Sequence, residues 1–177
     1  MLKDELREKS KYLSYLLRHK PEEAKCTLDN EGYVDVKTLL ENTDFTMELL
    51  DKLVEKDTRY AFSDDKTKIK AFHGHSKSFG INYKVDNDIP SVLYHGTSER
   101  NYELIKQSGM IKSMSRQNVH LSSSEEQAKL IGKRHGKPIV LFIDTKQMIK
   151  DGFVFFKSED NVYLTSDMPI KYIIKVV

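Results

Sequence analysis

The chain has 177 residues, of which 38% are hydrophobic and 32% are charged. No apolar run approaches the roughly 18 residues that a membrane helix needs, and the single cysteine, Cys26, excludes an internal disulfide. The formal net charge is +2. Residues 1–90 hold 16 basic and 18 acidic residues, whereas residues 91–177 hold 13 and 9. This balance excludes a strongly basic nucleic-acid binder, so a polyanion would have to bind at a local site.

The start of the chain, Met1 to Arg7, lacks the apolar core of a secretory signal peptide. A single cysteine also suits a reducing compartment. We therefore expect a cytoplasmic monomer with no membrane association. The spread of Leu, Ile and Val, with 10% aromatic residues, predicts a packed core rather than disorder.

The first half begins with an amphipathic helix. Its leucines recur at helical spacing, and Pro21 ends the helix near Lys20. These leucines are Leu6, Leu13, Leu16 and Leu17. Asp35 can then cap a short second helix that runs through Leu40.

A third helix is predicted from a cap at Asp44 or Thr46. Its expected buried stripe consists of Leu49, Leu50, Leu53 and Val54. Residues 60–62 and 69–72 flank a polar turn, as in a β-hairpin. Three helices followed by a two-stranded wing predict a winged-helix lobe, which we bound at residues 1–85.

The second half, residues 86–177, alternates short strands with helices. One helix is predicted over residues 98–108, with Leu104 and Ile105 facing inward, and a capping box opens another over residues 123–134. The predicted strands cover residues 92–94, 119–121, 139–143, 154–156, 162–164 and 172–176. The later strands are too closely spaced for parallel crossovers, so we predict an α+β fold with a mainly antiparallel sheet.

Several segments carry residues suited to chemistry. Arg18 and His19 stand at a helix C-terminus, where cations also simply complement the helix dipole. Arg59 stands at a helix-to-strand corner, where an exposed, solvated arginine is the ordinary interpretation. Arg116 and His120 lie close together in the sequence, on a loop and the short strand that follows it.

A further segment, residues 93–97, ends a predicted strand in His95, Gly96 and Thr97. A histidine at a strand end is often only structural. This segment, however, combines a ring, a glycine that lets backbone approach a ligand closely, and a hydroxyl.

The common nucleotide-binding glycine motifs are absent. His73 and His75 could supply two metal ligands, but no cysteine or acidic residue stands nearby, so we expect a solvated or RNA-facing loop and no metal. Cys26 is interpreted as a small apolar residue of the core.

Six sequence blocks occur in a distinctive order. They are Leu13-Ser-Tyr-Leu-Leu-Arg-His-Lys-Pro21, Leu28-Asp-Asn-Glu-Gly-Tyr-Val-Asp-Val36, Gly74-His-Ser76, Leu93-Tyr-His-Gly-Thr97, Met114-Ser-Arg-Gln-Asn-Val-His-Leu-Ser122 and Asn161-Val-Tyr-Leu164. In this order they resemble the RNA 2'-phosphotransferase family, over about residues 4–175. That family removes an RNA 2'-phosphate by transferring it to NAD.

The resemblance implies an N-terminal winged-helix lobe for RNA and a C-terminal ADP-ribosyltransferase-like lobe for NAD, a co-substrate. It implies a catalytic group of Arg18, His19, Arg59 and Arg116. Arg59 and Arg116, with His75, would contact RNA bearing a 2'-phosphate, such as a spliced tRNA. The residues implied for the NAD pocket are His95, Gly96, Thr97, His120, Leu121 and Ser122.

The reaction implied by the resemblance has two steps. The 2'-phosphate first attacks NAD and releases nicotinamide, which gives an ADP-ribosylated RNA. A ribose hydroxyl then displaces the RNA 2'-hydroxyl, which leaves ADP-ribose 1'',2''-cyclic phosphate. A phosphate monoester is already mostly dianionic at pH 7, so it needs orientation by guanidinium groups rather than a general base. His19 is the natural donor to the leaving oxygen, either of a proton or only of a hydrogen bond.

The chain departs from the family in two places. His73, preceded by Phe72, stands where a glutamine is common, and Lys70 stands where an arginine is frequent on the wing strand. Two other functions stay open. One is an ADP-ribosyltransferase that acts on terminal phosphates of nucleic acid or on protein, and the other is a non-enzymatic winged-helix RNA binder. The joint presence of the four catalytic candidates favours the two-step enzyme.

Overall fold

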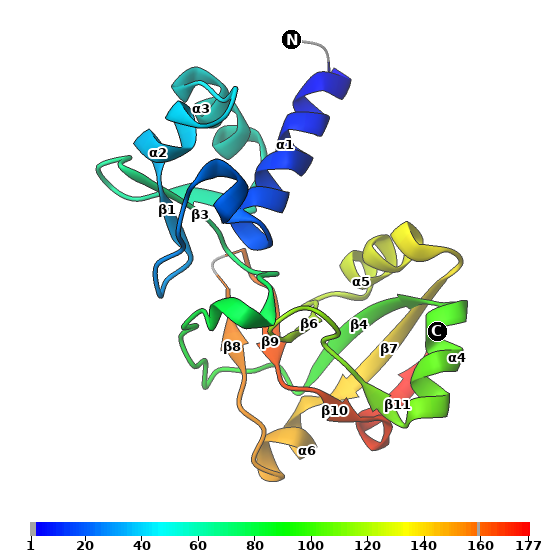
Figure 1. The fold of residues 1–177 in the computed structure, drawn as a ribbon. Helices are drawn as coiled ribbons and strands as arrows, with labels where there is room; N and C mark the ends of the chain where they lie inside the picture. The colour runs from blue at the N-terminus through cyan, green and yellow to red at the C-terminus, as the bar shows by residue number, and fades with distance from the viewer. Residues whose placement is uncertain (1–2, 159) are drawn as a thin grey trace. The chain divides into compact units, whose positions relative to one another are not determined.

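The computed structural model describes residues 3–158 and 160–177. The chain divides into two compact units, Met1–Asn82 and Tyr83–Val177 (Figure 1). Each unit combines helices with strands, and every strand pair in the described residues is antiparallel. The predicted α+β class with a mainly antiparallel sheet is therefore confirmed.

The first unit contains three α-helices and one small sheet. Its helices are α1 (Lys3–Arg18), α2 (Val36–Glu41) and α3 (Met47–Lys56), and its strands are β1 (Tyr33–Asp35), β2 (Tyr60–Phe62) and β3 (Lys68–Ala71). Two 3-10 helices, Pro21–Ala24 and Lys77–Phe79, complete it. The strand order is β1-β3-β2. The predicted hairpin is thus extended by β1, which was not predicted because a three-residue strand that ends in the helix cap Asp35 is too short to show an alternating pattern.

The helix caps follow the sequence closely. The Asp35 side chain accepts a hydrogen bond from Thr38 N over 2.7 Å, as an N-cap carboxylate does. For α3, Thr46 rather than Asp44 is the cap, because its hydroxyl accepts from Leu49 N over 3.2 Å. These two caps fix where α2 and α3 begin.

An apolar core holds the first unit together. Its fully buried leucines come from α1, α2 and α3, and Ile69 of β3 is buried with them. Cys26 is 7% exposed and belongs to this core, as predicted, and burial raises the pKa of its thiol. Within the predicted stripe of α3, Leu50 and Leu53 are buried, whereas Leu49 and Val54 are half-buried.

The described residues of the second unit form three short sheets. Its strands are β4 (Val92–Ser98), β5 (Met110–Ile111), β6 (Val119–Leu121), β7 (Pro138–Asp144), β8 (Phe156–Lys157), β9 (Tyr163–Thr165), β10 (Met168–Pro169) and β11 (Ile173–Val176). Its α-helices are α4 (Glu99–Ser108), α5 (Glu125–Gly132) and α6 (Thr145–Lys150), with 3-10 helices at Lys133–His135 and Ile170–Tyr172. The sheet orders are β11-β7-β4, β6-β9-β8 and β10-β5.

Several predictions for the second unit were wrong in detail. Leu104 does not face inward, since it is 55% exposed, whereas its neighbour Ile105 packs on the core. The cap of α5 is Ser124, one residue later than predicted, because its hydroxyl accepts from Gln127 N. Three elements, α6, β5 and β10, were not predicted because each is too short for a clear period. The end of α5 at Gly132 also precedes the predicted end.

The strand β4 determines where the candidate histidine lies. It runs to Ser98 and pairs with β7 along its whole length. His95, Gly96 and Thr97 therefore lie inside a strand, not at its end as predicted. A bridge between Tyr94 and Ser122 joins β4 to the neighbouring strand β6, with reciprocal backbone bonds of 3.0 and 2.7 Å. None of the described helices is long and apolar enough to cross a membrane.

Candidate active-site residues

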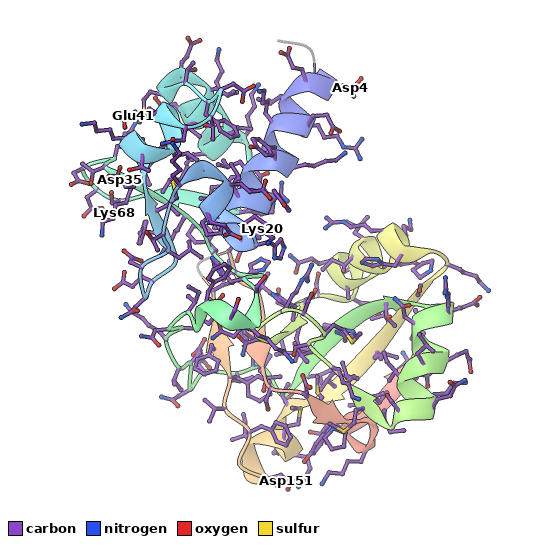
Figure 2. All side chains as sticks on the ribbon, in the orientation of Figure 1. Asp4, Lys20, Asp35, Glu41, Lys68 and Asp151 are labelled. Carbon is purple, nitrogen blue, oxygen red and sulfur yellow. The ribbon has the colours of Figure 1, made fainter. Side chains whose placement is uncertain are left out.

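Arg18 and His19 stand where α1 ends, just before Lys20, which is labelled in Figure 2. His19 N and Lys20 N both donate to Tyr15 O, over 2.9 and 3.1 Å, and so close the last turn. Pro21 cannot continue the helix, because it lacks an amide hydrogen. Both candidate side chains are half-buried. The helix end thus presents adjacent guanidinium and imidazole groups.

The segment of residues 74–76 packs against this helix end. Ser76 N donates to Arg18 O over 3.0 Å, and Ser76 Oγ lies 3.0 Å from His19 Nδ1. Gly74 has a φ of 90°, a conformation that favours glycine, and a Cβ there would lie 3.5 Å from Arg18 Cδ. The segment therefore fixes the backbone of Arg18 and the ring of His19.

His75, between these two anchors, is buried. It is 1% exposed, and a Cβ on Gly32 would lie 3.1 Å from its Nε2. Burial, and then the charges of Arg18 and other nearby basic groups, lowers the pKa of His75 to about 3. The ring is therefore neutral at pH 7. The expectation of a solvated loop is wrong for this side chain, because the ring fills space beside Gly32. The contact of His75 with RNA stays a prediction.

Arg59 is held by an acidic partner. Its Nε donates to Asp57 Oδ1 over 2.8 Å, and its Nη2 donates to Asp57 Oδ2 and, over 2.8 Å, to Ser10 Oγ. The side chain of Arg59 is 38% exposed and that of Asp57 is 20% exposed. The expectation of a freely solvated arginine is therefore wrong: the guanidinium has a fixed orientation in the first unit.

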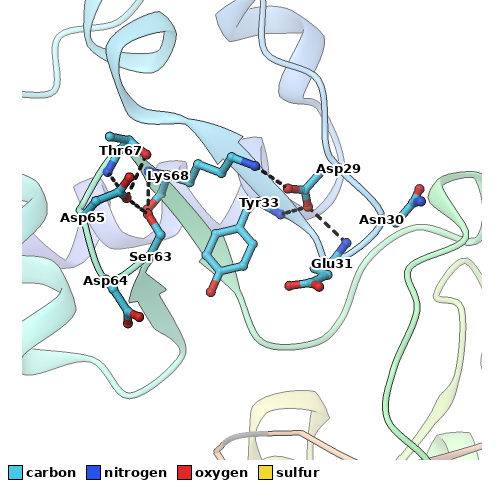
Figure 3. Close-up of a pocket in the computed structure, with 9 residues that line it drawn as sticks. All are labelled: Asp29, Asn30, Glu31, Tyr33, Ser63, Asp64, Asp65, Thr67 and Lys68. Carbon is cyan, nitrogen blue, oxygen red and sulfur yellow. Dashed lines mark hydrogen bonds and ion pairs between the residues drawn. The ribbon is translucent and has the colours of Figure 1, made fainter.

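A separate pocket of about 550 Å³ opens between β1 and the β2–β3 turn (Figure 3). The charged residues that line it are Asp29, Glu31, Asp64, Asp65 and Lys68. Lys68 is paired with Asp29 over 3.1 Å, as the dashed line shows. With four acidic groups and one basic group, this pocket disfavours phosphate, and none of the catalytic candidates lines it.

In the second unit, His95 has a defined tautomer. Its Nδ1 lies 3.1 Å from His120 O. Because a carbonyl only accepts, Nδ1 carries the hydrogen of this bond. Burial lowers the pKa of His95, although the bond to His120 opposes that effect. The ring is thus neutral, and its Nε2 carries a lone pair that can accept a hydrogen bond from a hydroxyl.

Helix packing requires a glycine at position 96, whether or not a ligand binds there. A Cβ at this position would lie 1.8 Å from Ala128 O and 2.6 Å from Ala128 C, both in the backbone of α5. A Cβ on Gly132 would likewise lie 2.5 Å from Thr97 O. The two glycines let α5 lie directly on β4. The interpretation of Gly96 as a point of close approach to a ligand thus competes with a helix that already occupies this space.

The other residues expected at the NAD pocket are mostly interior. Thr97, Leu121 and Ser122 are buried, whereas His120 is half-buried. Ser122 joins β6 to β4 through its backbone bonds with Tyr94. These residues bring His95 and His120 together and fix their strands.

Arg116 lies on the loop between β5 and β6. Its N donates to Ser113 O over 3.1 Å, and Ser113 N donates to Asp167 Oδ1 over 2.8 Å, so the base of the loop is anchored. Desolvation by neighbouring atoms is the larger cause that lowers the pKa of Arg116, and the charge of Arg134 is the second. The side chain is nevertheless exposed, so it stays charged at pH 7. Arg116 belongs to the second unit, whereas Arg18, His19 and Arg59 belong to the first.

The residues that hold these groups were not among the predicted site residues. Asp57 and Ser10 orient Arg59, Ser76 orients His19, and Asp167 anchors the loop of Arg116. Two of them gave a signal in the sequence: Asp57 stands two residues before Arg59, and Ser76 belongs to the block Gly74-His-Ser76. Among residues 3–158 and 160–177, no group of three or more His, Cys, Asp or Glu side chains is arranged to hold a metal.

The first unit thus carries cationic groups suited to phosphate, and the second carries a neutral histidine suited to a hydroxyl. Comparison with known proteins agrees with this assignment to phosphate chemistry. The model of the RNA 2'-phosphotransferase, Tpt1 / KptA family matches residues 4–167.

Curated relatives carry the same name. A protein named "Probable RNA 2'-phosphotransferase" from Fusobacterium nucleatum is 42% identical over 171 residues, which cover 92% of this chain and 94% of the relative. The Flavobacterium johnsoniae protein of that name is 43% identical, with 93% of each chain covered. One from Escherichia coli is 38% identical over 176 residues, with 96% of this chain and 95% of the relative covered. This chain belongs to the RNA 2'-phosphotransferase family, a family of transferases, as its sequence blocks predicted.

Proposed function

We propose that this chain is an NAD-dependent RNA 2'-phosphotransferase. In this proposal the first unit is a winged-helix-like lobe that binds RNA, and the second is an ADP-ribosyltransferase-like lobe that binds NAD. The family match carries the proposal, because it covers residues 4–167 and so includes every candidate residue in both units. The RNA is of the kind that bears an internal 2'-phosphate, such as a spliced tRNA.

The 2'-phosphate needs cationic partners with fixed orientation. A phosphate monoester carries close to two negative charges at pH 7. Planar guanidinium groups bind its oxygens with defined geometry, and we assign this role to Arg18, Arg59 and Arg116. Support comes from the way Asp57 holds Arg59 and residues 74–76 hold the end of α1.

In the first step, a 2'-phosphate oxygen forms a bond to the nicotinamide-bearing ribose carbon of NAD, and the bond from that carbon to nicotinamide breaks. The nucleophile is already charged, so the side chains orient it and no base removes a proton. Holding two reactants in line contributes a large part of such a rate enhancement.

In the second step, the neighbouring ribose hydroxyl attacks the phosphorus, and the bond to the RNA 2'-oxygen breaks. Charge builds on the phosphoryl oxygens, where fixed arginines stabilise it. The proton lost by the attacking hydroxyl is balanced by the one that the RNA 2'-oxygen gains. We assign the donor role to His19 through Nε2, because its Nδ1 faces Ser76 Oγ. The products are 2'-hydroxyl RNA and ADP-ribose 1'',2''-cyclic phosphate.

His95 suits the NAD end of the reaction. NAD carries ribose hydroxyls, and a neutral imidazole with a hydrogen on Nδ1 accepts a hydroxyl hydrogen at Nε2. The bond from His95 Nδ1 to His120 O supports this tautomer. We propose that His95 binds a ribose hydroxyl of NAD and so helps to position the reacting carbon.

The test is a reaction of the chain with an oligonucleotide that carries one internal 2'-phosphate. We expect nicotinamide release and a 2'-hydroxyl product only when NAD is present. A matched oligonucleotide with a 5'-phosphate and no 2'-phosphate should give no product. Stable ADP-ribosylation of that control would instead identify a terminal-phosphate ADP-ribosyltransferase, and RNA binding with no product from either substrate would identify a non-enzymatic binder.

A further inference from the structure

A network of polar side chains surrounds Arg59 in the first unit. Asp57 accepts two hydrogen bonds from the guanidinium, one from Nε and one from Nη2. Ser10 of α1 donates its hydroxyl hydrogen to Asp57 Oδ2 over 2.9 Å and accepts from Arg59 Nη2 over 2.8 Å. The three side chains thus form a closed ring of hydrogen bonds.

Further contacts anchor the helix side of this ring. Ser10 is only 8% exposed. The Tyr60 hydroxyl, itself in a residue that is 3% exposed, donates to Ser10 O over 2.7 Å and lies 2.5 Å from Ser14 Oγ. These bonds tie β2 to α1 directly beside Arg59, so Ser10 has little freedom to move.

Asp57 is ionised, and its negative charge stabilises the pair with Arg59. Burial acts to raise the pKa of Asp57, but the hydrogen bonds and charge of Arg59, with the Ser10 hydroxyl, outweigh it and lower the pKa below its ordinary value. The carboxylate is therefore charged at the pH at which a phosphate dianion is present, and the pair with Arg59 persists.

We propose that Asp57, supported by Ser10, is the positioning residue for Arg59 in phosphate transfer. It accepts hydrogen bonds from both Nε and Nη2 and so fixes the plane of the guanidinium group. This inference rests on the proposed function, and it assigns Asp57 no contact with substrate. An arginine without this partner would keep its charge but lose its orientation.

The charge of Asp57 has a second consequence. A carboxylate beside Arg59 weakens the attraction of this arginine for a phosphate. Loss of Asp57 should therefore lower kcat without raising the KM for RNA. A merely structural residue would lower the melting temperature and the active fraction together, and would leave the KM for RNA unchanged.

The test compares Asp57→Ala, Arg59→Ala and the double variant with wild-type enzyme on 2'-phosphorylated RNA. Misplacing a reacting group costs about 10²-fold, so we expect Asp57→Ala to lower kcat by roughly 10- to 100-fold and to lower the KM for RNA as well. In the Arg59→Ala background, adding Asp57→Ala should cost less than about 2-fold, because residues that act through each other are not additive. Asp64→Ala is the matched control. It removes the same charge from an exposed position of the same unit, and it should keep wild-type kcat.

A readout independent of activity uses ¹⁵N-labelled arginine and nuclear magnetic resonance. The Nε–H signal of Arg59, assigned by its absence in Arg59→Lys, should exchange slowly with water in the wild type and rapidly in Asp57→Asn. Equal exchange rates, or fold losses that multiply in the double variant, would overturn the inference. Absence of NAD-dependent 2'-phosphate removal by the wild type would instead overturn the proposed function, and the exchange measurement would still decide the orientation of Arg59.

Discussion

A methyl group added at Gly96 separates a structural role for this glycine from a role in ligand binding. The new Cβ would lie 1.8 Å from Ala128 O, whereas a Cβ and a heavy atom of a residue that is not its chain neighbour essentially never come within 3.0 Å of each other. Helix α5 would have to move by more than 1 Å away from β4. Because backbone rather than a side chain must give way, we expect the upper part of the usual range for overpacking, about 3 kcal/mol.

The assay is thermal unfolding of Gly96→Ala, followed by circular dichroism. For a folding unit of the size of Tyr83–Val177, a destabilisation of about 3 kcal/mol lowers Tm by roughly 12–24 °C. Gly132→Ala, whose Cβ would lie 2.5 Å from Thr97 O, should show a smaller fall. The exposed Ser123→Ala should leave Tm unchanged within about 2 °C. A wild-type Tm for Gly96→Ala, combined with a raised KM for NAD, would refute the packing argument and support close approach to a ligand.

Further predictions concern individual side chains. The pKa of His75, about 3 in the folded chain against an ordinary 6.5, means that the unfolded chain binds more protons below pH 6.5. The free energy of unfolding should therefore fall by about 1.4 kcal/mol per pH unit between pH 6.5 and pH 3. In urea unfolding, His75→Gln should lose this slope, and an unchanged slope would contradict the assignment. His95→Ala should raise the KM for NAD by about 2- to 10-fold, as the loss of one hydrogen bond does, and leave RNA affinity intact. A larger effect on RNA binding, measured by titration, would reverse the assignment of ligands to units. Arg18→Ala should slow the second step by about 10²–10³-fold and so build up ADP-ribosylated RNA on a gel. Equal slowing of nicotinamide release, with no such band, would place Arg18 in the first step.

The helices of the first unit could be predicted because their signals are local. The leucine spacing of α1 and the caps at Asp35 and Thr46 act within one or two turns of each helix. Strand β1 could not be predicted, because it exists only through pairing with β3, and three residues carry no period of their own.

In the candidate site, too, local features could be predicted from the sequence and long-range contacts could not. Arg18 and His19 could be named from their block and Arg59 from its helix-to-strand corner, but the bonds that Ser76 and Ser10 make to these residues could not be predicted. Each bond joins residues at least 49 positions apart, and no local pattern encodes it. The exposure of Leu104 was mispredicted for a related reason, since a helix with few apolar residues leaves the direction of its buried face undetermined.

The destination of the phosphate group decides whether the chain transfers it from RNA to NAD. The substrate is an oligonucleotide with one internal 2'-phosphate that carries ¹⁸O at its non-bridging oxygens. It is incubated with the chain and NAD, and the masses of the products are measured by mass spectrometry. The labelled phosphate group should appear in ADP-ribose 1'',2''-cyclic phosphate, in amounts equal to the nicotinamide released and to the 2'-hydroxyl RNA formed. Labelled inorganic phosphate released without NAD consumption, or label that stays on the RNA after all the nicotinamide is released, would contradict it.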